Sequence, residues 1–400
     1  SSKFPANSRW GFFPSASLGW VVSEENFASF MRPVINTLKI RGSLGQVGNQ
    51  DVGTNRFIST MTASNSNWLI NGQHPNQVSV PGLVSPDLTW EKVTTLDVGV
   101  DGSALKNKFS FTVDWFRRIT SGMLSAGVAV PSTLGTGAPL RNYGELTTKG
   151  IEVELSFRHT FQNGIGIQVS GMFFDYKTKI TKFASATDPL ISSNYEGKIV
   201  GEIWGYVTDR LFQPDDFEYD ANGNIAKITL PNGQVKNAYV KGIPTQYIFE
   251  SGAFLFSPGD VKFKDLNGDG VIDYGKNTVS DHGDLKRIGN TQPRYEYGFR
   301  LGFSYKGFDF STFFQGVGKR ALWARGTIVM AGYNATEANY EYQLDYWTPE
   351  NPNAFYPRPI NYGSAAQWNY QVQTRYMLNL AYLRCKTMRI GYSVPNKVLR

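Results

Sequence analysis

Hydrophobic and polar residues alternate most clearly in the stretch from Tyr295 to Gln315. In its first half, five apolar or aromatic residues alternate with Gly, Arg, Gly and Ser; in its second half, three phenylalanines share a face while Phe313 intrudes on the other. A period of two places successive side chains on opposite faces of a β-strand, whereas a helix would spread these aromatics around its circumference. The stretch therefore predicts two strands joined by a tight turn at Lys306-Gly307, with one hydrophobic face.

The same alternation recurs along the chain and predicts further strands. We expect them at residues 16–22, 38–44, 96–101, 109–115, 151–158, 165–173 and 388–392, with a short helical turn at 27–31 that Pro33 ends. Residues 48–85, 119–146 and 319–377 show no sustained period and are expected to be long connections. The segment 183–292 is longer still, and Asn222-Gly223 and Asn232-Gly233 are turn signals that indicate folding on itself.

The order of these connections favours one architecture. Each pair of strands joined by a short link is followed by a long excursion, and in an up-and-down meander this order sorts short turns to one end and long loops to the other. The sequence therefore predicts an all-β fold, an antiparallel up-and-down transmembrane β-barrel segment with long extracellular loops. Its polar face, which carries Glu152, Glu154, Arg158 and Arg300, would line a water-filled or plugged lumen, and its hydrophobic face would meet outer-membrane lipid.

Composition agrees with a turn-rich β protein. The 400 residues contain 14% aromatics, 41 Gly and only 18% charged residues, and we find no run of about 18 or more apolar residues that would form a transmembrane helix. Cys385 is the single cysteine, so an internal disulfide and a cysteine-based metal cluster are excluded. The net charge is +7, but the basic residues are scattered, which argues against a nucleic-acid partner. Ser1 begins within a pattern and no signal peptide precedes it, which suggests a fragment or a processed form.

The sequence carries no signature of an enzyme. His74, His159 and His282 are far apart, and none has the spacing of a metal-binding pair. The glycines at 164 and 166 follow a hairpin turn rather than precede a helix, so they do not form a dinucleotide-binding loop.

One acidic stretch has the spacing of a calcium loop. Oxygen-bearing residues stand at positions 1, 3, 5 and 9 of an EF-hand-like loop, with Gly270 at position 6 and a main-chain carbonyl at 7: Asp265, Asn267, Asp269, Asp273 and, through its carbonyl, Val271. Lys276 stands at position 12 and cannot coordinate, so Asp281 or Asp284 would have to supply that ligand. The pattern predicts a Ca²⁺ site in an exterior loop; the alternative is a metal-free loop in which the same side chains bond their own backbone.

A second group of candidates lies near the C-terminal end of the chain. Six aromatic residues crowd one expected exterior loop, where they could stack on sugar rings or contact a partner protein: Tyr340, Tyr342, Tyr346, Trp347, Tyr356 and Trp368. The alternative for each residue is packing within the loop itself or a place in an aromatic girdle at the membrane surface.

Short motifs spread over nearly the whole chain are similar to those of one known family. Around the acidic loop and the central hairpin they are Asp265-Leu266-Asn267-Gly268-Asp269-Gly270-Val271-Ile272-Asp273, Ile288-Gly289-Asn290 with Pro293, Tyr297-Gly298, Tyr305-Lys306-Gly307-Phe308-Asp309 and Gln315-Gly316. Elsewhere they are Trp10-Gly11-Phe12-Phe13-Pro14-Ser15, Gly45-Gln46-Val47-Gly48-Asn49-Gln50, Leu88-Thr89-Trp90-Glu91, Ile203-Trp204-Gly205-Tyr206, Tyr346-Trp347-Thr348-Pro349-Glu350-Asn351-Pro352 and Tyr382-Leu383-Arg384. In this combination and order they resemble the barrel of SusC/RagA-type TonB-dependent transporters.

The resemblance implies an importer of oligosaccharides or peptides in the outer membrane of a bacterium, energised by TonB and capped by a SusD-like surface lipoprotein. It also implies that residues 1–400 are part of a barrel of about 22 strands, with a large extracellular region at 183–292. The family's plug, its TonB-contacting segment and its closing strands would lie outside this sequence. Two other functions stay open: a secreted, soluble β-rich glycan-binding module with a Ca²⁺ loop, and a passive porin.

Overall fold

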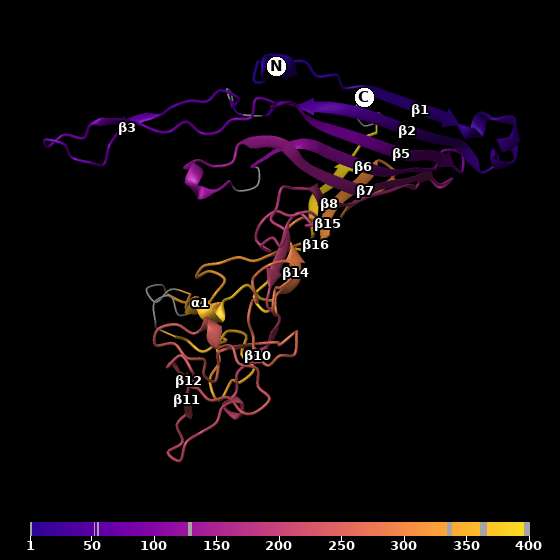
Figure 1. The fold of residues 1–400 in the computed structure, drawn as a ribbon. Helices are drawn as coiled ribbons and strands as arrows, with labels where there is room; N and C mark the ends of the chain where they lie inside the picture. Colours follow the sequence, from indigo (N-terminus) through magenta and orange to yellow (C-terminus); the bar gives the residue numbers. More distant parts are fainter. Residues whose placement is uncertain are drawn as a thin grey trace.

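A nine-stranded antiparallel sheet dominates the computed structural model, which describes residues 2–51, 53, 56–126, 130–333, 338–360 and 366–395 (Figure 1). Each strand pairs with the neighbouring long strand in the sequence, so the sheet is an up-and-down meander, as predicted. In sheet order the strands are β1 (Ser15–Val21), β2 (Ile35–Asn49), β5 (Glu91–Ala104), β6 (Phe109–Ala126), β7 (Leu140–Thr160), β8 (Gly166–Lys182), β15 (Arg294–Tyr305), β16 (Phe308–Lys319) and β19 (Tyr382–Tyr392).

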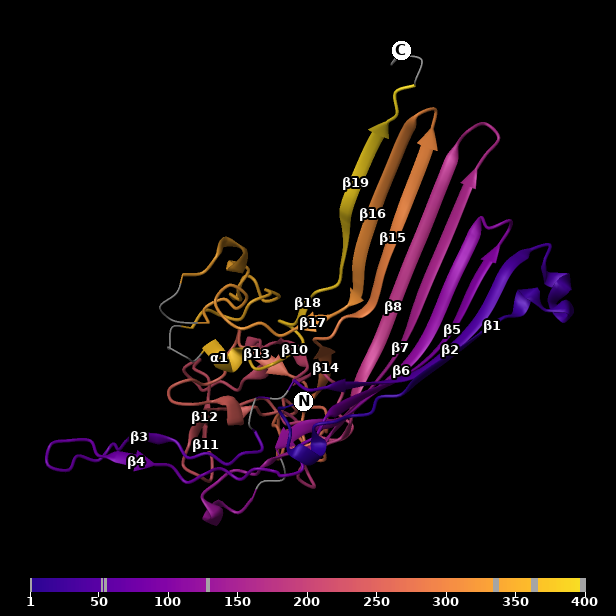
Figure 2. The ribbon, with the colours of Figure 1, turned by 90° about the horizontal axis from the view of Figure 1, so that it is seen from above.

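The connections between these strands are sorted by end (Figure 2). At one edge, here called the short-turn end, three links are tight turns at 105–108, 161–165 and 306–307, and the fourth, 22–34, contains the 3₁₀ helices η2 (Val22–Glu24) and η3 (Asn26–Met31). At the opposite edge, the long-loop end, the links are 50–90, 127–139, 183–293 and 320–381. This arrangement follows the predicted order of short and long connections.

The predicted connection at 119–146 is wrong in its extent. Strand β6 continues to Ala126 and β7 begins at Leu140, so the link is no longer than the one at 22–34. Polar residues such as Thr120 and Ser121 stay in register with β7, because main-chain pairing does not require the apolar alternation that marks the rest of the strand. The 50–90 link also contains a small hairpin of β3 (Ala63–Asn65) and β4 (Asn76–Val78), which the sequence had not indicated.

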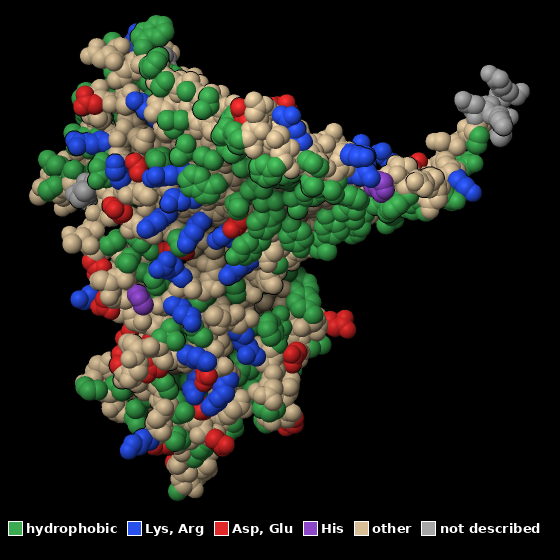
Figure 3. Space-filling model, turned by 90° about the vertical axis from the view of Figure 1, so that its right-hand side faces the viewer, with side chains coloured by type: hydrophobic (Ala, Val, Ile, Leu, Met, Phe, Trp, Pro, Cys, Tyr) green, Lys and Arg blue, Asp and Glu red, His purple; other side chains and the backbone are tan. Residues whose placement is uncertain are grey.

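Register brings the apolar positions of all the strands onto one face, here called the hydrophobic face. One continuous row joins residues directly opposite each other on six strands: Ile40, Val100, Val113, Val153, Phe173 and Tyr297. Phe111, Val153 and Phe299 are half-buried rather than enclosed, and Ile390 is 75% exposed. Figure 3 shows hydrophobic side chains gathered into one continuous surface. A surface of this extent without protein cover in the described chain is typical of contact with lipid or a partner, rather than of a core.

The hydrophobic core of the molecule lies outside the sheet, in the loop region formed by residues 183–293 and 320–381. Every member of the largest buried cluster belongs to these two excursions, among them Phe212, Phe254, Phe256, Phe263, Ile272, Met330, Trp347, Tyr356 and Tyr370. Short elements frame it: β9 (Glu202–Gly205), β10 (Thr208–Leu211), β11 (Lys227–Thr229), β12 (Val235–Asn237), β13 (Val261–Phe263), β14 (Lys286–Asn290), β17 (Ala321–Leu322), β18 (Leu378–Asn379) and α1 (Ala366–Asn369).

The 183–292 segment therefore folds on itself as expected, but it shares its core with the second excursion. The main-chain N–H of Tyr206 donates to the carbonyl of Val372 at 2.8 Å, and that of Val261 donates to Asn369 Oδ1 at 2.8 Å. Gly223 and Gly233 have φ of +78° and +80° at the two predicted turns, a conformation that favours glycine. Among the described residues, the helices are all too short or too polar to cross a membrane.

Candidate functional site

The face of the sheet opposite the hydrophobic one, here called the polar face, carries a network centred on Arg41 of β2. Its guanidinium lies 3.2 Å from Asp97, 2.9 Å from Asp101 and 2.6 Å from Asp114, three carboxylates supplied by β5 and β6. Gly99 faces Arg41 across the strand pair, and a Cβ there would lie 2.7 Å from the guanidinium carbon. The glycine thus leaves the room that the cation occupies. Lys39 lies directly opposite Asp101 and adds a second cation, so two cations among three carboxylates leave a net negative charge on this part of the polar face.

The negative charge continues along the polar face into a hollow of about 540 Å³. Three carboxylates line it, from Glu152 and Glu154 of β7 and Glu296 of β15, together with Thr112 and Gln315. Within the described chain, none of its lining residues is basic. This hollow therefore presents hydrogen-bond acceptors and negative charge.

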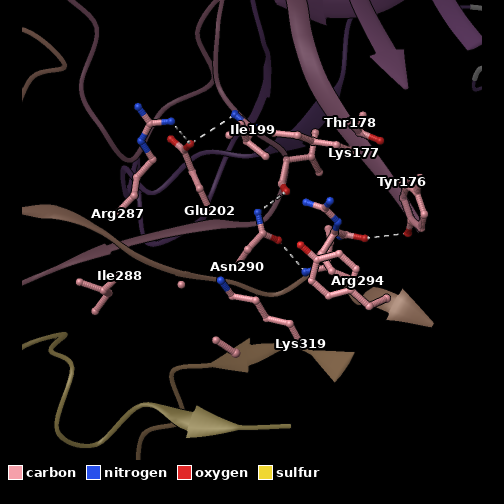
Figure 4. Close-up of a pocket in the computed structure, with 15 residues that line it drawn as sticks. Tyr176, Lys177, Thr178, Ile199, Glu202, Arg287, Ile288, Asn290, Arg294 and Lys319 are labelled. Atoms are coloured by element: carbon pink, nitrogen blue, oxygen red, sulfur yellow. Dashed lines mark hydrogen bonds and ion pairs between the residues drawn. The ribbon is translucent and has the colours of Figure 1, made fainter. Parts of the chain in front are cut away.

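A second, smaller cavity of about 280 Å³ lies where the loop region meets the sheet (Figure 4). Buried Glu202 of β9 organises one wall: it accepts hydrogen bonds from Tyr195 at 2.5 Å and Trp204 at 2.8 Å, and lies 3.7 Å from Arg287. Burial, followed by the bond to Glu202, raises the pKa of Tyr195 to about 12, so its hydroxyl stays a donor at neutral pH.

On the sheet side of this cavity, Tyr176 of β8 donates to Gln292 at 3.3 Å, and Asn290 donates to the carbonyl of Val200 at 3.0 Å. Arg294 binds Asp175 through two contacts of 2.5 and 2.6 Å. The first bond joins the end of the long excursion to β8, the second joins the two ends of the excursion to each other, and the ion pair joins β15 to β8. The cavity is thus a junction that fixes the loop region on the rim of the sheet.

The acidic loop at 265–273 has its carboxylates turned toward its own backbone. Asp265 accepts hydrogen bonds from the N–H groups of Gly268 at 2.6 Å and Gly270 at 2.8 Å, and Asp269 accepts one from Val271 at 2.8 Å. Asn267 and Asp273 make equivalent bonds, to the N–H groups two residues further on. In the part of the chain that the structure describes, no group of three or more His, Cys, Asp or Glu side chains is arranged to hold a metal ion. Ca²⁺ binding here stays a prediction.

The two residues considered for the missing twelfth ligand differ. Asp281 lies 3.9 Å from Lys276, the residue that replaced the ligand. Asp284 is fully buried and accepts hydrogen bonds from the N–H groups of Leu266 at 2.6 Å and Asp273 at 2.9 Å. Burial raises the pKa of Asp284, and the nearby charge of Asp265 adds to this. Asp284 therefore closes the loop by joining its two ends.

The six aromatic candidates fall into two groups. Trp347 and Tyr356 are buried in the core of the loop region, and Tyr346 and Trp368 pack against that core. Tyr340 and Tyr342 are exposed and stack on each other with ring centroids 5.6 Å apart. Of the six, this pair is the most accessible to a sugar or a partner protein. Their role in binding stays a prediction.

The Arg41 network was not among the candidate sites predicted from the sequence. Its four members come from three strands and lie up to 73 residues apart in the sequence, so no local motif identifies them. The signal that could have found them is the register: Arg41, Gly99, Asp114 and Glu152 lie directly opposite one another on successive strands.

Comparison with known proteins places this architecture in context. The family model described as "TonB dependent receptor-like, beta-barrel" matches residues 1–201. The chain is 26% identical over 412 residues to TonB-dependent receptor P3 of Formosa agariphila, covering 100% of this chain and 36% of that protein. It is 25% identical over 403 residues to TonB-dependent receptor SusC of Bacteroides thetaiotaomicron, covering 99% of this chain and 35% of SusC.

Among solved structures, the RagAB peptide transporter has a similar fold, with a TM-score of 0.69 at 19% identity over 99% of this chain and 38% of that one. The "open-open" state of the RagAB peptide importer gives a TM-score of 0.68 at 19% identity, over 100% of this chain and 38% of that one. The chain thus spans just over a third of the length of the relatives that it matches.

Proposed function

Because the chain belongs to the family of TonB dependent receptor-like β-barrels, which are outer-membrane proteins, we propose that it builds part of the wall of an active importer of oligosaccharides or peptides. The family is one of transporters and receptors rather than enzymes. In this proposal TonB supplies the energy, and a SusD-like surface lipoprotein closes the passage from outside.

The two-sided sheet is the observation that carries the proposal. Its hydrophobic face is uncovered in the described chain, whereas its polar face holds the Arg41 network and the acidic hollow of about 540 Å³. Hydrocarbon on one side and water on the other are the two environments that a transmembrane barrel wall separates. A secreted glycan-binding module would instead need those apolar positions inside a core.

The chemistry of the polar face supports a hydroxyl-rich or amide-rich substrate. Glu152, Glu154 and Glu296 present acceptors to a passing solute, and sugar hydroxyls and peptide N–H groups are the donors that such oxygens bind. Both substrate classes fit this description. One similar structure is named a peptide transporter, which is the reason to test peptides beside oligosaccharides.

The exposed pair Tyr340 and Tyr342 is the candidate contact for the lipoprotein. Both side chains lie in the loop region at the long-loop end, where a cap would approach. Aromatic residues that offer rigid contact area are enriched at protein interfaces.

Uptake by cells tests the proposal. Cells of the source bacterium that produce the full-length protein should accumulate labelled oligosaccharides or labelled peptides, and cells that lack it should not. Removal of TonB or of the proton-motive force should abolish this uptake. Uptake that persists without TonB would identify a passive porin, and no difference for either substrate class between producing and deleted cells would overturn the importer proposal.

A further inference from the structure

We propose that Arg117, Lys149 and Lys177 form a binding site for the phosphate groups of a lipid in the outer leaflet, on the hydrophobic face of the sheet. The site would hold lipid beside the barrel and is separate from the passage that the polar face would line.

Register places the three cations next to one another. Arg117 of β6 lies directly opposite Lys149 of β7, and Lys149 lies directly opposite Lys177 of β8. Side chains directly opposite in an antiparallel pair have Cβ atoms about 4.5–5.5 Å apart, and like charges in that relation destabilise the sheet. Three cations in one row repel one another, so an anion from outside the sheet would stabilise them.

The row lies on the face that also carries the apolar side chains. Two residues closer to the short-turn end, the same strands carry Trp115, which is 42% exposed, and Ile151, which is 39% exposed. Below these come Val113 and Val153 of the continuous apolar row. Along β6 and β7 the charges thus follow directly after Trp115 and Ile151, and one further apolar residue of this face, Ile119, lies two residues beyond Arg117.

Along the membrane normal, the three cations lie at the height expected for the boundary between hydrocarbon and headgroups. A strand rises about 3.3 Å per residue and barrel strands tilt by about 35–45°, so each residue adds about 2.5 Å of height. Arg117 lies eight residues after Phe109 in β6, hence about 20 Å from the short-turn edge, near the top of an apolar band that is about 25 Å tall in such barrels. Trp115 beside it is the kind of aromatic residue that marks this boundary.

No carboxylate of the described chain neutralises this row. Arg117, Lys149 and Lys177 are exposed and make no ion pair or hydrogen bond there, in contrast to Arg41 on the polar face, which has three carboxylates. The nearest acidic residue along β8 is Asp175, and Arg294 occupies both of its oxygens. Figure 3 shows Lys and Arg side chains gathered along the border of the hydrophobic surface.

Phosphate is the anion that suits these groups. A guanidinium binds phosphate oxygens through paired N–H donors, and the two ammonium groups add compact positive charge. The apolar surface directly below would contact the acyl chains of the same molecule, so the occupant is a phosphorylated lipid rather than a soluble phosphate. Clustered basic residues beside a membrane surface bind anionic headgroups in this way.

The test measures binding of lipid A by the full-length protein purified in detergent, with bound lipid counted by native mass spectrometry. The variant Arg117→Gln/Lys149→Gln/Lys177→Gln should lose at least tenfold in affinity for diphosphoryl lipid A. The unmodified protein should bind phosphate-free lipid A with the same weak affinity as this variant. Folding of each variant is checked by heat-modifiability on a gel.

Two further variants complete the test. Arg118→Gln/Arg158→Gln/Arg300→Gln removes the same charge from the polar face and should bind diphosphoryl lipid A as the unmodified protein does. The charge-conserving variant Arg117→Lys/Lys149→Arg/Lys177→Arg should also retain binding. Unchanged affinity in the first variant, or an equal loss in the polar-face variant, would overturn the proposal. Displacement of the lipid by an equal concentration of inorganic phosphate would overturn its assignment to a lipid.

Discussion

Phe303 on β15 is 45% exposed, whereas Phe254 in the loop region is 2% exposed. The same type of side chain is thus exposed on the sheet and buried in the loop region. In the loop region, apolar residues leave water by packing on one another, and the charges that accompany them inward are paired. In the sheet, apolar residues gather on the exposed hydrophobic face, and Arg41 and its three carboxylates form a network on the polar face.

The two parts are therefore stabilised by different interactions. The loop region resembles a small water-soluble domain whose stability depends on its core and its buried ion pairs. The sheet has continuous main-chain pairing but no core of its own in the described chain, so its stability depends on the membrane and on the strands that complete the barrel. The same kind of substitution should therefore have opposite effects on stability in the two parts.

The largest effect is expected in the loop region from Arg358→Met. Asp260 is fully buried and depends on Arg358 at 2.9 Å and Asn369 at 2.8 Å. Burial raises the pKa of Asp260, and Arg358 opposes that rise. Removal of one partner of a buried pair costs about 3–5 kcal/mol. Hydrogen exchange of the loop region should report the loss, and Lys276→Met, which removes an exposed cation beside Asp281, should change it by no more than about 0.5 kcal/mol.

A smaller effect is expected in the sheet from Phe111→Arg. Phe111 lies on the hydrophobic face opposite Leu155, and an arginine exposed to lipid at mid-membrane costs about 2–4 kcal/mol. Thr112→Arg is the matched control, because Thr112 lies on the polar face and donates to Asp101 at 3.2 Å. The folded fraction on a heat-modifiability gel should fall for the first variant only. Equal damage from both would mean that the two faces do not have different surroundings.

Next in size is the response of the acidic loop to calcium. If this loop binds Ca²⁺, a chelator should shorten its half-life toward a protease by about tenfold, equivalent to about 1.4 kcal/mol. Asp265→Asn/Asp269→Asn should abolish the response. Asp220→Asn is the control, because Asp220 accepts the N–H groups of Asn222 and Asn224 at 2.9 Å in a loop without the calcium spacing. Equal half-lives with and without chelator in the unmodified protein would exclude Ca²⁺ binding by this loop.

The smallest effect concerns pH. Burial raises the pKa of Glu250, although Lys236 at 3.0 Å opposes the rise. The folded state therefore holds the Glu250 proton more tightly than the unfolded state. This contribution to stability is complete below the ordinary pKa of a glutamate and is lost as pH rises through the raised value. Unfolding of the loop region followed against pH should show a smaller decline in Glu250→Gln than in the unmodified protein and the exposed-site variant Glu341→Gln. Some decline remains in all three, because burial also raises the pKa values of Asp260 and Asp284.

Much of the sheet could be predicted from the sequence because a strand with unlike surroundings on its two faces must alternate. The stretch from Tyr295 to Gln315 shows this best: its paired residues Phe299 and Phe314 lie on the hydrophobic face, and the intruding Phe313 lies on the polar face, beneath the guanidinium of Arg300 at 5.8 Å. The end of β6 at Ala126 was missed because the register with β7 shifts between Ser121 and Leu124, so the neighbouring apolar residues Met123 and Leu124 do not follow the alternation.

The loop region could not be predicted to the same depth. Trp347 and Tyr340 are close in the sequence and similar in chemistry, yet one is buried in the core and the other is exposed. Without a periodic element, nothing local fixes which side of the chain faces the core. The partners of Trp347 and Asp260 come from another excursion, so their burial depends on contacts across more than a hundred residues.

The core that the two excursions share has a consequence for engineering. Residues 183–293 and 320–381 are separated in the sequence by the hairpin of β15 and β16, but Val261 and Asn369 bond to each other across that gap. In a chimera that takes only one excursion from a relative, the side chains of that excursion would not pack against the core residues of the other. Exchange of recognition surfaces between such proteins should therefore succeed when both segments, with the intervening hairpin, are transplanted as a unit.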